Sequence, residues 1–349
     1  MKIRNSALAG IALAATAALG LTACGGGTPA GNGSSASGGA PSGEITVYNA
    51  QHESLTKEWV DAFTAETGIK VTLRQGDDTE MSNQIIQEGQ ASPADVFLTE
   101  NSPAMTQVEN AGLFADVNKD TLDQVPAEFS PSTGKWTGIA ARSTVLVYNK
   151  SKVTEDKLPK SMLDLASPEW KGRWAASPTG ADFQAIVSAL LELKGESATE
   201  DWLKAMKDNS KAYKGNSTAM KAVNAGEVDA ALIYHYYYGD QAKTGENSNN
   251  VTPYYFKNQD PGAFLSVSGG GVLKSSKNAA AAQAFLKFIT GKKGQEVLKN
   301  GTSFEYAIGS DVPANDKLVP IKDLQAPKVD AAKLNSQKVS DLMTQAGLL

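Results

Sequence analysis

The sequence predicts an α/β fold of two lobes, with helices on both faces of a mixed, mostly parallel sheet in each lobe and hinge strands between the lobes. Strand-like and helix-like segments alternate after residue 43, and such alternation indicates a parallel sheet covered by helices. The chain has 349 residues, enough for about two domains of ~150 residues each. Two longer strand-like runs, at 143–151 and 262–274, lie where the chain would cross between lobes.

The first block of elements begins with a β-branched, apolar run at 44–50, which predicts a strand. A helix is expected at 54–68, because Leu55, Trp59 and Phe63 recur at four-residue spacing and a glycine is placed to end it. The block continues with a strand at 69–75, a helix at 78–89, a strand at 94–100 and a helix at 102–113. The strand at 94–100 is apolar enough to be buried on both faces.

The second block repeats the alternation. Its predicted elements are a strand at 172–177, helices at 182–195 and 199–209, and a strand at 228–234. Two further helices are expected at 278–300 and 336–347. No internal repeat is present in the sequence. Lobe 1 is expected to comprise 44–142 with about 267–314, and lobe 2 about 143–266 with 315–349.

Residues 1–23 are expected to be a lipoprotein signal peptide. Lys2 and Arg4 give a positive start, and the Ala/Leu-rich run behind them is too short and too rich in small residues for a membrane span. The stretch at 21–24 resembles the bacterial lipobox, whose cysteine, here Cys24, becomes the lipidated first residue of the mature protein. A location on the outer face of the cytoplasmic membrane is therefore expected.

Cys24 is the only cysteine in the chain. This excludes an intramolecular disulfide, a thiolate zinc site and an iron–sulfur cluster. Residues 24–43, the lipidated cysteine and a Gly/Ser-rich linker, are expected to form a flexible tether that reaches roughly 25 Å. Without residues 1–23 the chain carries 31 basic and 38 acidic residues. That balance argues against nucleic acid as a partner, because phosphates attract basic surfaces.

Three predicted strands end in side chains that could bind a ligand. His52 follows the first strand, Glu100 ends the strand at 94–100, and Tyr234–Tyr238 follow the strand at 228–234. Ligands of open parallel sheets bind at the carboxyl ends of strands, so these groups are expected to meet. Each also has a plain interpretation: a solvated histidine, a charge favoured near a helix start, and tyrosines that pack or stack on a sugar.

A carboxylate, an imidazole and phenols together suggest a hard metal ion. Phenol has a reference pKa near ~10, so only a strong Lewis acid would hold it as phenolate at neutral pH, and ferric ion is the common candidate. Magnesium or calcium would call for more carboxylates and carbonyls. Tyr236 and Tyr237 could share one metal only if the backbone turns there, because neighbouring side chains diverge in a regular strand or helix. Gly239 just beyond suits such a turn.

An anion site is expected beside the metal. Thr179, Gly180 and Ala181 lead from a strand into a helix, where backbone N–H groups and a hydroxyl can bind an anion. An ordinary turn that caps the helix explains the same residues equally well.

From about Ile45 to Leu348 the sequence resembles the ferric-ion-binding proteins of bacterial ABC importers, also called bacterial transferrins. The resemblance rests on the stretches "ITVYNAQHES", "FTAETGIKVTL", "SPADVFLTEN", "NSTAMKAVNAGEVDAALI", "QDPGAFLSVSGGGVLKSSKN" and "KKGQEVL". It implies a two-lobed periplasmic-binding-protein type II fold that closes over its ligand by hinge motion. It also implies a monomer that delivers its cargo to an ABC permease and the permease's ATPase.

The resemblance also implies site residues. The family's iron ligands fall on four positions of this sequence: His52, Glu100, Tyr236 and Tyr237. Its synergistic anion, phosphate or carbonate, would be held by Thr179, Gly180, Ala181 and Asn216. The second asparagine of that pattern is replaced by Tyr234, so Tyr234 or Tyr238 is expected to line the cleft or supply a further phenolate. An anion would make the site negative, and Arg142 is the candidate basic neighbour.

Two other functions compete with ferric transport. A receptor for an organic solute such as thiamine, a polyamine or a phosphonate would use the tyrosines for stacking. A secreted hydrolase has little support, because His235 beside tyrosines makes no triad and no G-x-S-x-G occurs. The acid pair Asp77 and Asp78 is interpreted as solvated surface. No enzymatic activity is expected.

Overall fold

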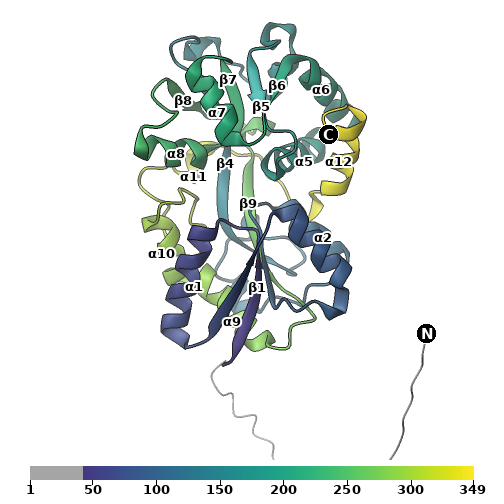
Figure 1. Cartoon of the computed structure of the whole chain (residues 1–349), viewed down its shortest axis with the longest axis vertical. Coiled ribbons are helices and arrows are strands. Elements are labelled where there is room, and N and C mark those ends of the chain that lie inside the picture. Colours follow the sequence, from purple (N-terminus) through teal and green to yellow (C-terminus); the bar gives the residue numbers. More distant parts are fainter. Residues whose placement is uncertain (1–41) are drawn as a thin grey trace, which may run out of the picture. The chain divides into compact units, whose positions relative to one another are not determined.

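Two central strands, β4 (Thr137–Asn149) and β9 (Leu265–Val272), join the halves of the computed structural model, which describes residues 42–349. Residues 137–143 of β4 pair with β9, and residues 144–149 pair with β7 or β8. The strands therefore run from one half of the sheet into the other (Figure 1). The predicted signal peptide, Cys24 and nearly all of the predicted linker lie outside the described residues.

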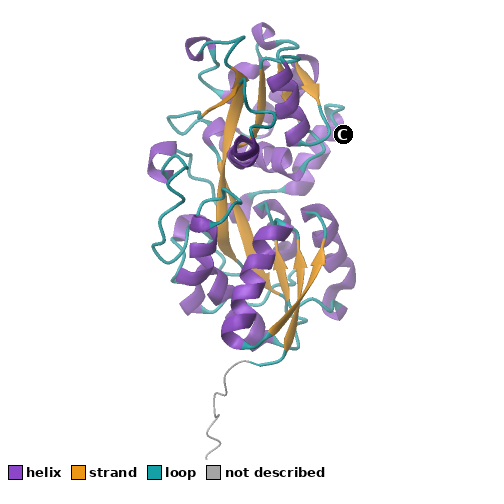
Figure 2. Cartoon of the chain, turned by 60° about the vertical axis from the view of Figure 1, so that its left-hand side comes forward, coloured by secondary structure: helices purple, strands orange, loops and turns teal. Residues whose placement is uncertain are grey.

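Over residues 42–349 the sheet has nine strands, in the order β2-β1-β3-β9-β4-β7-β5-β6, with β8 paired to β4. The remaining strands are β1 (Glu44–Asn49), β2 (Lys70–Gln75), β3 (Val96–Leu98), β5 (Trp174–Ala176), β6 (Ser210–Ala212), β7 (Ala230–Tyr234) and β8 (Val251–Tyr254). Strand β1 is parallel to β2 and β3, and β5 is parallel to β6 and β7. Antiparallel pairing occurs where β4 and β9 join the two parallel parts. Helices flank both parts (Figure 2). The predicted α/β class is confirmed.

The first half packs α1 (Glu53–Thr67), α2 (Asp78–Glu88), α3 (Ser102–Asn110), α9 (Ala279–Thr290) and α10 (Lys292–Asn300) against its strands. Leu55, Trp59 and Phe63 of α1 are buried, as their spacing predicts. Trp59 also donates its indole N–H to the Gly294 carbonyl at 2.8 Å. This bond fixes α1 against α10. The loop that leads into α1 therefore ends at a helix that is held in place.

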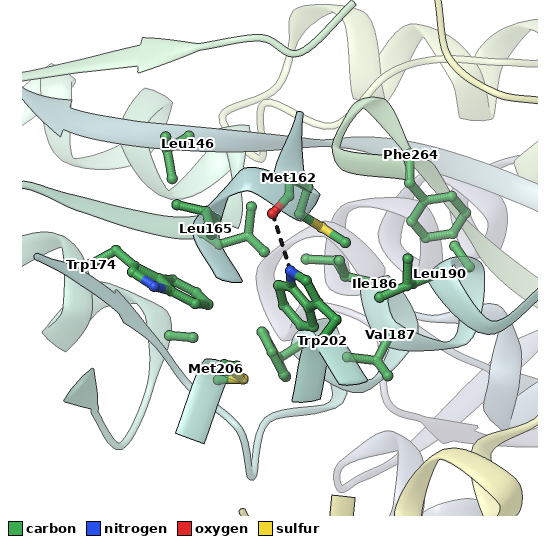
Figure 3. Packing of buried hydrophobic residues seen from close by; sticks show 14 of the residues in the cluster. Leu146, Met162, Leu165, Trp174, Ile186, Val187, Leu190, Trp202, Met206 and Phe264 are labelled. Atoms are coloured by element: carbon green, nitrogen blue, oxygen red, sulfur yellow. Dashed lines mark hydrogen bonds between the residues drawn. The ribbon is translucent and has the colours of Figure 1, made fainter. Parts of the chain in front are cut away.

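The second half contains α5 (Ala181–Lys194), α6 (Glu196–Asn209), α7 (Asn216–Ala225), α8 (His235–Thr244) and α12 (Ser336–Gln345). Its core centres on Trp202, which lies 5.9 Å from Trp174 and 6.2 Å from Phe183 between ring centroids. The Trp202 indole donates to the Met162 carbonyl at 3.1 Å, as Figure 3 shows. The shorter elements are α4 (Lys119–Leu122), α11 (Ile321–Leu324), η1 (Gly89–Ala91), η2 (Ala127–Phe129), η3 (Glu155–Lys157), η4 (Met162–Ala166), η5 (Pro168–Trp170), η6 (Pro261–Ala263) and η7 (Ala331–Lys333).

Some predicted elements differ from the structure. The single helix expected at 278–300 is two helices, because Gly291 between α9 and α10 has an extended backbone; the Gln295 side chain donates to the Ile289 carbonyl beside this break. Helices α7 and α8 and strands β6 and β8 were not predicted. Helix α8 was not predicted because the tyrosine run at its start looks like the end of a strand. Within residues 42–349, no helix has the length and apolar character needed to cross a membrane.

Candidate metal centre

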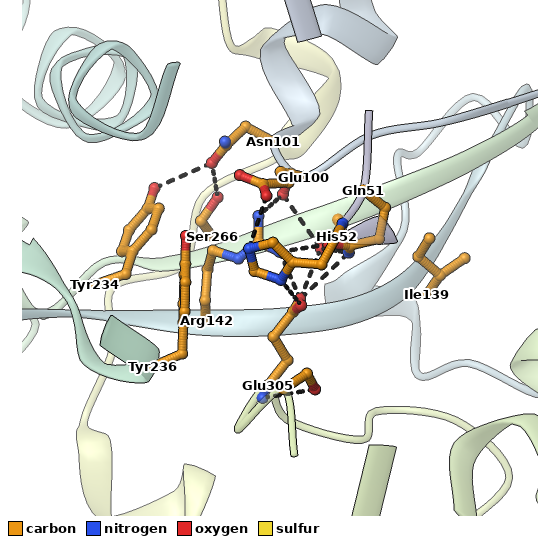
Figure 4. Close-up of polar contacts among 12 residues, drawn as sticks. Gln51, His52, Glu100, Asn101, Ile139, Arg142, Tyr234, Tyr236, Ser266 and Glu305 are labelled. Carbon is orange, nitrogen blue, oxygen red and sulfur yellow. Dashed lines mark hydrogen bonds and ion pairs between the residues drawn. The ribbon is translucent and has the colours of Figure 1, made fainter. Parts of the chain in front are cut away.

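His52 and Glu100 lie at the carboxyl ends of neighbouring strands. His52 occupies the N-cap position of α1 after β1, and Glu100 comes two residues after β3. Because β1 and β3 pair in parallel, their ends meet on one side of the sheet. His52 Nε2 is 2.8 Å from Glu100 Oε1. The imidazole and the carboxylate that the sequence places at separate strand ends are therefore in direct contact (Figure 4).

Tyr236 and Tyr237 lie in the first turn of α8, directly after β7. Their rings stack with centroids 4.2 Å apart. The Tyr236 ring also meets the His52 ring edge-on, with centroids 4.9 Å apart and an interplanar angle of 70°. A continuous chain of contacts thus joins the four predicted ligands, although they come from three different strand ends.

Asp182, in the first turn of α5, lies between the phenols. Its Oδ2 accepts from the Tyr236 hydroxyl at 3.3 Å and from the Tyr237 hydroxyl at 2.9 Å. Asn216 Nδ2 donates to the same oxygen at 2.8 Å, and Asn101 Nδ2 donates to Oδ1 at 2.9 Å. Asp182 is missing from the predicted site, since an acid early in a helix is usually explained by the helix dipole. Its place directly after the predicted anion turn was the available signal.

Gly180 and Asn216 of the predicted anion site have hydrogen-bond partners within the chain. The Gly180 N–H donates to the Ser177 carbonyl at 3.0 Å, and the Thr179 side chain is exposed. Ala181 begins α5 and is half-buried. Asn216 is oriented toward the site, but its donor is bonded to the Asp182 carboxylate. The carboxylate therefore takes a hydrogen bond that the resemblance assigns to an anion.

Arg142, the predicted basic neighbour, is fully buried on β4. It donates to the Glu100 carbonyl oxygen and, at 2.5 Å, to Glu305 Oε2. Its guanidinium carbon lies 5.5 Å from the Tyr236 ring centroid and 6.0 Å from that of Tyr234. The guanidinium thus lies close to the rings of Tyr234 and Tyr236, and it is paired with the Glu305 carboxylate.

The other two tyrosines have different surroundings. The buried Tyr234 hydroxyl is 3.3 Å from both Asn101 Oδ1 and the Asp182 carbonyl oxygen. Tyr238 is half-buried and packs on the apolar cluster that contains Val145. Gly239 does not make the turn expected of it: it lies inside α8, and a Cβ there would be 2.8 Å from the Phe304 ring. Close packing therefore explains this glycine.

Two buried acidic residues, Glu305 and Asp78, hydrogen-bond to the His52 ring and to the backbone of Glu100. Glu305 Oε1 lies 2.9 Å from His52 Nδ1. Asp78 accepts from the backbone N–H groups of Glu100 and Asn101, each at 3.0 Å. Asp78 is 5% exposed, so its interpretation as solvated surface is wrong, because the turn after β3 folds over it. Asp77 is exposed and caps α2 by accepting from the Glu80 N–H at 2.7 Å.

The protonation of these groups follows from burial and from their partners. Burial lowers the pKa of His52, but hydrogen bonds to Glu100 and Glu305 outweigh it and raise the pKa to about 10. Burial raises the pKa of Glu305, but Arg142 and His52 outweigh this and hold it at about 2. Burial, followed by the negative charges of Asp182 and Glu100, raises the pKa of both Tyr236 and Tyr237 well above the usual range. The phenols therefore keep their protons until a strong Lewis acid replaces them.

The donor set determines what this site can bind. It offers carboxylate and phenol oxygens and one imidazole nitrogen, which are ligands for a hard, highly charged cation. Over the described residues, no three His, Cys, Asp or Glu side chains already lie close enough together to hold a metal ion, and Asp182 is linked to the site through hydrogen bonds from the phenols. The cluster around His52 and Glu100 instead combines two such residues with two tyrosines.

A cavity of about 1060 Å³ lies elsewhere, with Phe129, Leu265, Val267 and Leu334 among its lining residues. Strand β9 separates this cavity from the site, because successive side chains of a strand face opposite sides. Ser266 and Ser268, which alternate with the lining residues, bond to Asn101 Oδ1 and the Glu100 carbonyl at 3.1 Å. The cavity therefore does not contain the candidate ligands.

Comparison with known proteins places the chain in a family. The sequence model described as bacterial extracellular solute-binding protein matches residues 91–335. The chain is 69% identical over 306 residues to the Fe(3+)-binding periplasmic protein of Serratia marcescens. This alignment covers 87% of this chain and 90% of that protein. It is 39% identical over 309 residues to the major ferric iron-binding protein of Neisseria meningitidis, with 87% and 93% covered. Iron-bound HitA from Pseudomonas aeruginosa superposes with a TM-score of 0.82 at 41% identity, covering 87% of this chain and 99% of that structure. The two-lobed architecture of the periplasmic binding proteins is thereby confirmed. The chain belongs to the bacterial extracellular solute-binding proteins, in the group that contains these ferric-iron-binding relatives.

Proposed function

We propose that this chain is an extracytoplasmic receptor that binds ferric iron between its lobes and delivers it to an ABC permease and its ATPase. The observation that carries the proposal is the meeting of His52 and Glu100 with two stacked tyrosines whose hydroxyls share one carboxylate oxygen. The 69% identity to an Fe(3+)-binding periplasmic protein supports it. The chain acts as a binding protein and catalyses no reaction.

The proposed ligands are His52 through Nε2, Glu100, and the phenolates of Tyr236 and Tyr237. Ferric ion is hard and trivalent, so it prefers anionic oxygen and can hold phenolate at neutral pH. Glu100 and the two phenolates would balance its charge. Metal entry has to remove the proton between His52 and Glu100 and both phenol protons, so iron binding is expected to release protons.

Asp182 is proposed as an additional ligand in the place that the resemblance gives to an anion. Its Oδ2 already lies within hydrogen-bond distance of both phenol oxygens, so a metal held by those oxygens would lie beside it. Loss of the phenol protons would free this carboxylate oxygen for the metal. A bound phosphate or carbonate, held by Thr179, Gly180, Ala181 and Asn216, is the competing arrangement. Arg142 is proposed to offset the extra negative charge in either case.

We propose that the lipidated Cys24 and the linker hold a monomeric receptor at the outer face of the cytoplasmic membrane, as the stretch at 21–24 suggests. The proposed lobes are 44–142 with about 267–314, and about 143–266 with 315–349. Strand β4 supports this division, because it changes partner from β9 to β7 after residue 143. The lobes would then close by rotation at the crossing strands.

Addition of ferric citrate to the full-length protein tests the proposal. Phenolate bound to ferric iron absorbs visible light, so a coloured one-to-one complex is expected. A receptor for thiamine, a polyamine or a phosphonate would give no such colour and would bind the organic solute instead. Colourless protein that does not retain iron contradicts ferric binding.

A further inference from the structure

Glu305 contacts one proposed ligand without lying among the others. It belongs to the segment after α10 and is wholly buried. Its Oε1 lies 2.9 Å from His52 Nδ1, the ring nitrogen opposite to the one that faces Glu100. The two residues are 253 positions apart in the sequence, so only the folded chain brings them together.

The Glu305 carboxylate is itself fixed in place. Its Oε2 accepts from Arg142 at 2.5 Å and lies 3.3 Å from both Ser268 Oγ and Gln51 Nε2. Oε1 is left for His52, as Figure 4 shows. Arg142 also donates to the Glu100 carbonyl, so one buried ion pair supports both ends of the His52–Glu100 contact.

An imidazole binds a metal only through a nitrogen that carries no proton, and the partner of its other nitrogen decides which one that is. An ionised carboxylate can only accept hydrogen bonds. Glu305 therefore requires a proton on His52 Nδ1 and leaves Nε2 as the nitrogen available to a metal. The same bond holds the ring plane so that Nε2 faces Glu100.

We infer that Glu305 is a positioning residue: through its hydrogen bond to Nδ1 it presents Nε2 of His52 to the metal. This inference rests on the proposed ferric function. Glu305 acts through His52 and is not itself a ligand. The segment that carries it also packs on the helix of the tyrosines, because Phe304 lies against Gly239 of α8. The position of the ring is thereby tied to both sides of the site.

The test is Glu305→Gln in the full-length protein. Arg142 needs an acceptor, so the amide oxygen of the glutamine would face Arg142 and its NH₂ group would face His52. An NH₂ donor selects the ring form with no proton on Nδ1 and one on Nε2, which opposes metal binding. Ferric affinity, measured by competition with citrate, is expected to fall about 10–100-fold, as for other residues that support metal ligands. Glu296→Gln, on the exposed side of α10, is the matched control and is expected to leave the affinity unchanged.

The ring itself provides a second readout that does not need iron. The chain has only 2 histidines, so ¹⁵N-histidine labelling gives the spectra of two rings, and His235→Gln assigns them. In the wild type, without metal and with diamagnetic Ga³⁺, Nδ1 of His52 is expected to carry a proton, and Ga³⁺ is expected to shift Nε2. In Glu305→Gln the Nδ1 proton is expected to be lost.

The outcomes separate the inference from the proposed function. Wild-type protein that binds no ferric iron contradicts the function itself, whereas the next outcomes, seen in protein that does bind iron, bear on the inference alone. Equal affinity in Glu305→Gln and wild type, or a wild-type Nδ1 without a proton, overturns the inference. If the variant unfolds on heating at a much lower temperature than the wild type, the ring spectra of the Ga³⁺-loaded wild type decide: metal on Nε2 supports the inference and metal on Nδ1 overturns it.

Discussion

His52 Nε2 and Glu100 Oε1 lie 2.8 Å apart, so two proposed iron ligands are hydrogen-bonded to each other. The phenol groups of Tyr236 and Tyr237 are likewise bonded to the carboxylate of Asp182. Protons thus occupy the positions between the donor atoms. Capture of a trivalent cation has to exchange those protons for one metal ion, and the expectations below follow from that exchange.

Replacement of both Tyr236 and Tyr237 by Phe should abolish ferric binding. Each change removes one proposed oxygen ligand, and loss of a direct ligand should cost more than the ~100-fold upper range for supporting residues. Citrate competition and the visible absorbance of the complex provide the measurement. Tyr213→Phe is the matched control, since the Tyr213 hydroxyl donates to Glu227 at 3.1 Å on the exposed surface. An organic solute that merely stacks on the rings would still bind the double variant, and retention of iron by that variant would refute phenolate coordination.

Ferric affinity should weaken as the pH falls. Burial and the charges of Asp182 and Glu100 raise the pKa of both phenols well above the usual range, so both are protonated before binding and ionised after it. Each proton released makes the binding constant fall by up to about tenfold per pH unit of acidification. Acid released on loading in weakly buffered solution can be counted by back-titration. Loading without proton release would show that the tyrosines stay protonated.

Asp182→Ala should make iron binding depend on an added anion. If the carboxylate is a ligand, the wild type needs no phosphate or carbonate, and the variant leaves room for one beside Asn216. Affinity is expected to drop in anion-free buffer and to recover in part with phosphate. Asp201→Asn, on the exposed face of α6, is the control. A wild type whose affinity rises strongly with phosphate would contradict the assignment of Asp182.

Asp78→Asn should destabilise the fold and loosen Glu100. The asparagine keeps one acceptor oxygen, so one of the two N–H groups bound by Asp78 loses its partner, at a cost of about 1–3 kcal/mol in the free energy of unfolding. Urea titration gives this free energy. The neighbouring Asp77→Asn should be nearly neutral, because asparagine is an equally good N-cap. Equal stabilities of the two variants would show that the Asp78 contacts contribute little.

Local patterns predicted much of the fold. The spacing of Leu55, Trp59 and Phe63 identified α1, because one face of that helix is buried. Strand ends identified His52, Glu100 and the tyrosine run, because the carboxyl ends of parallel strands converge. The resemblance then selected Tyr236 and Tyr237 from the run.

The rest depends on contacts that leave no local pattern. Glu305 lies in a loop and meets His52 only through the tertiary fold. In the sequence Asp78 looks like a surface acid, but in the folded chain the turn after β3 covers it. Helix α8 could not be predicted from its tyrosines, because aromatic residues favour strands. Their helical turn follows from burial in the folded protein.

Strand β9 sends Ser266 and Ser268 toward the ligands and Leu265 and Val267 toward the cavity on its far side. Deletion of a single residue from the start of this strand would turn every later side chain over. Hydroxyl groups would then point into the apolar cavity, and aliphatic side chains would face the proposed metal ligands. Removal of two residues would keep each face in its place, so the parity of the strand length is itself under constraint.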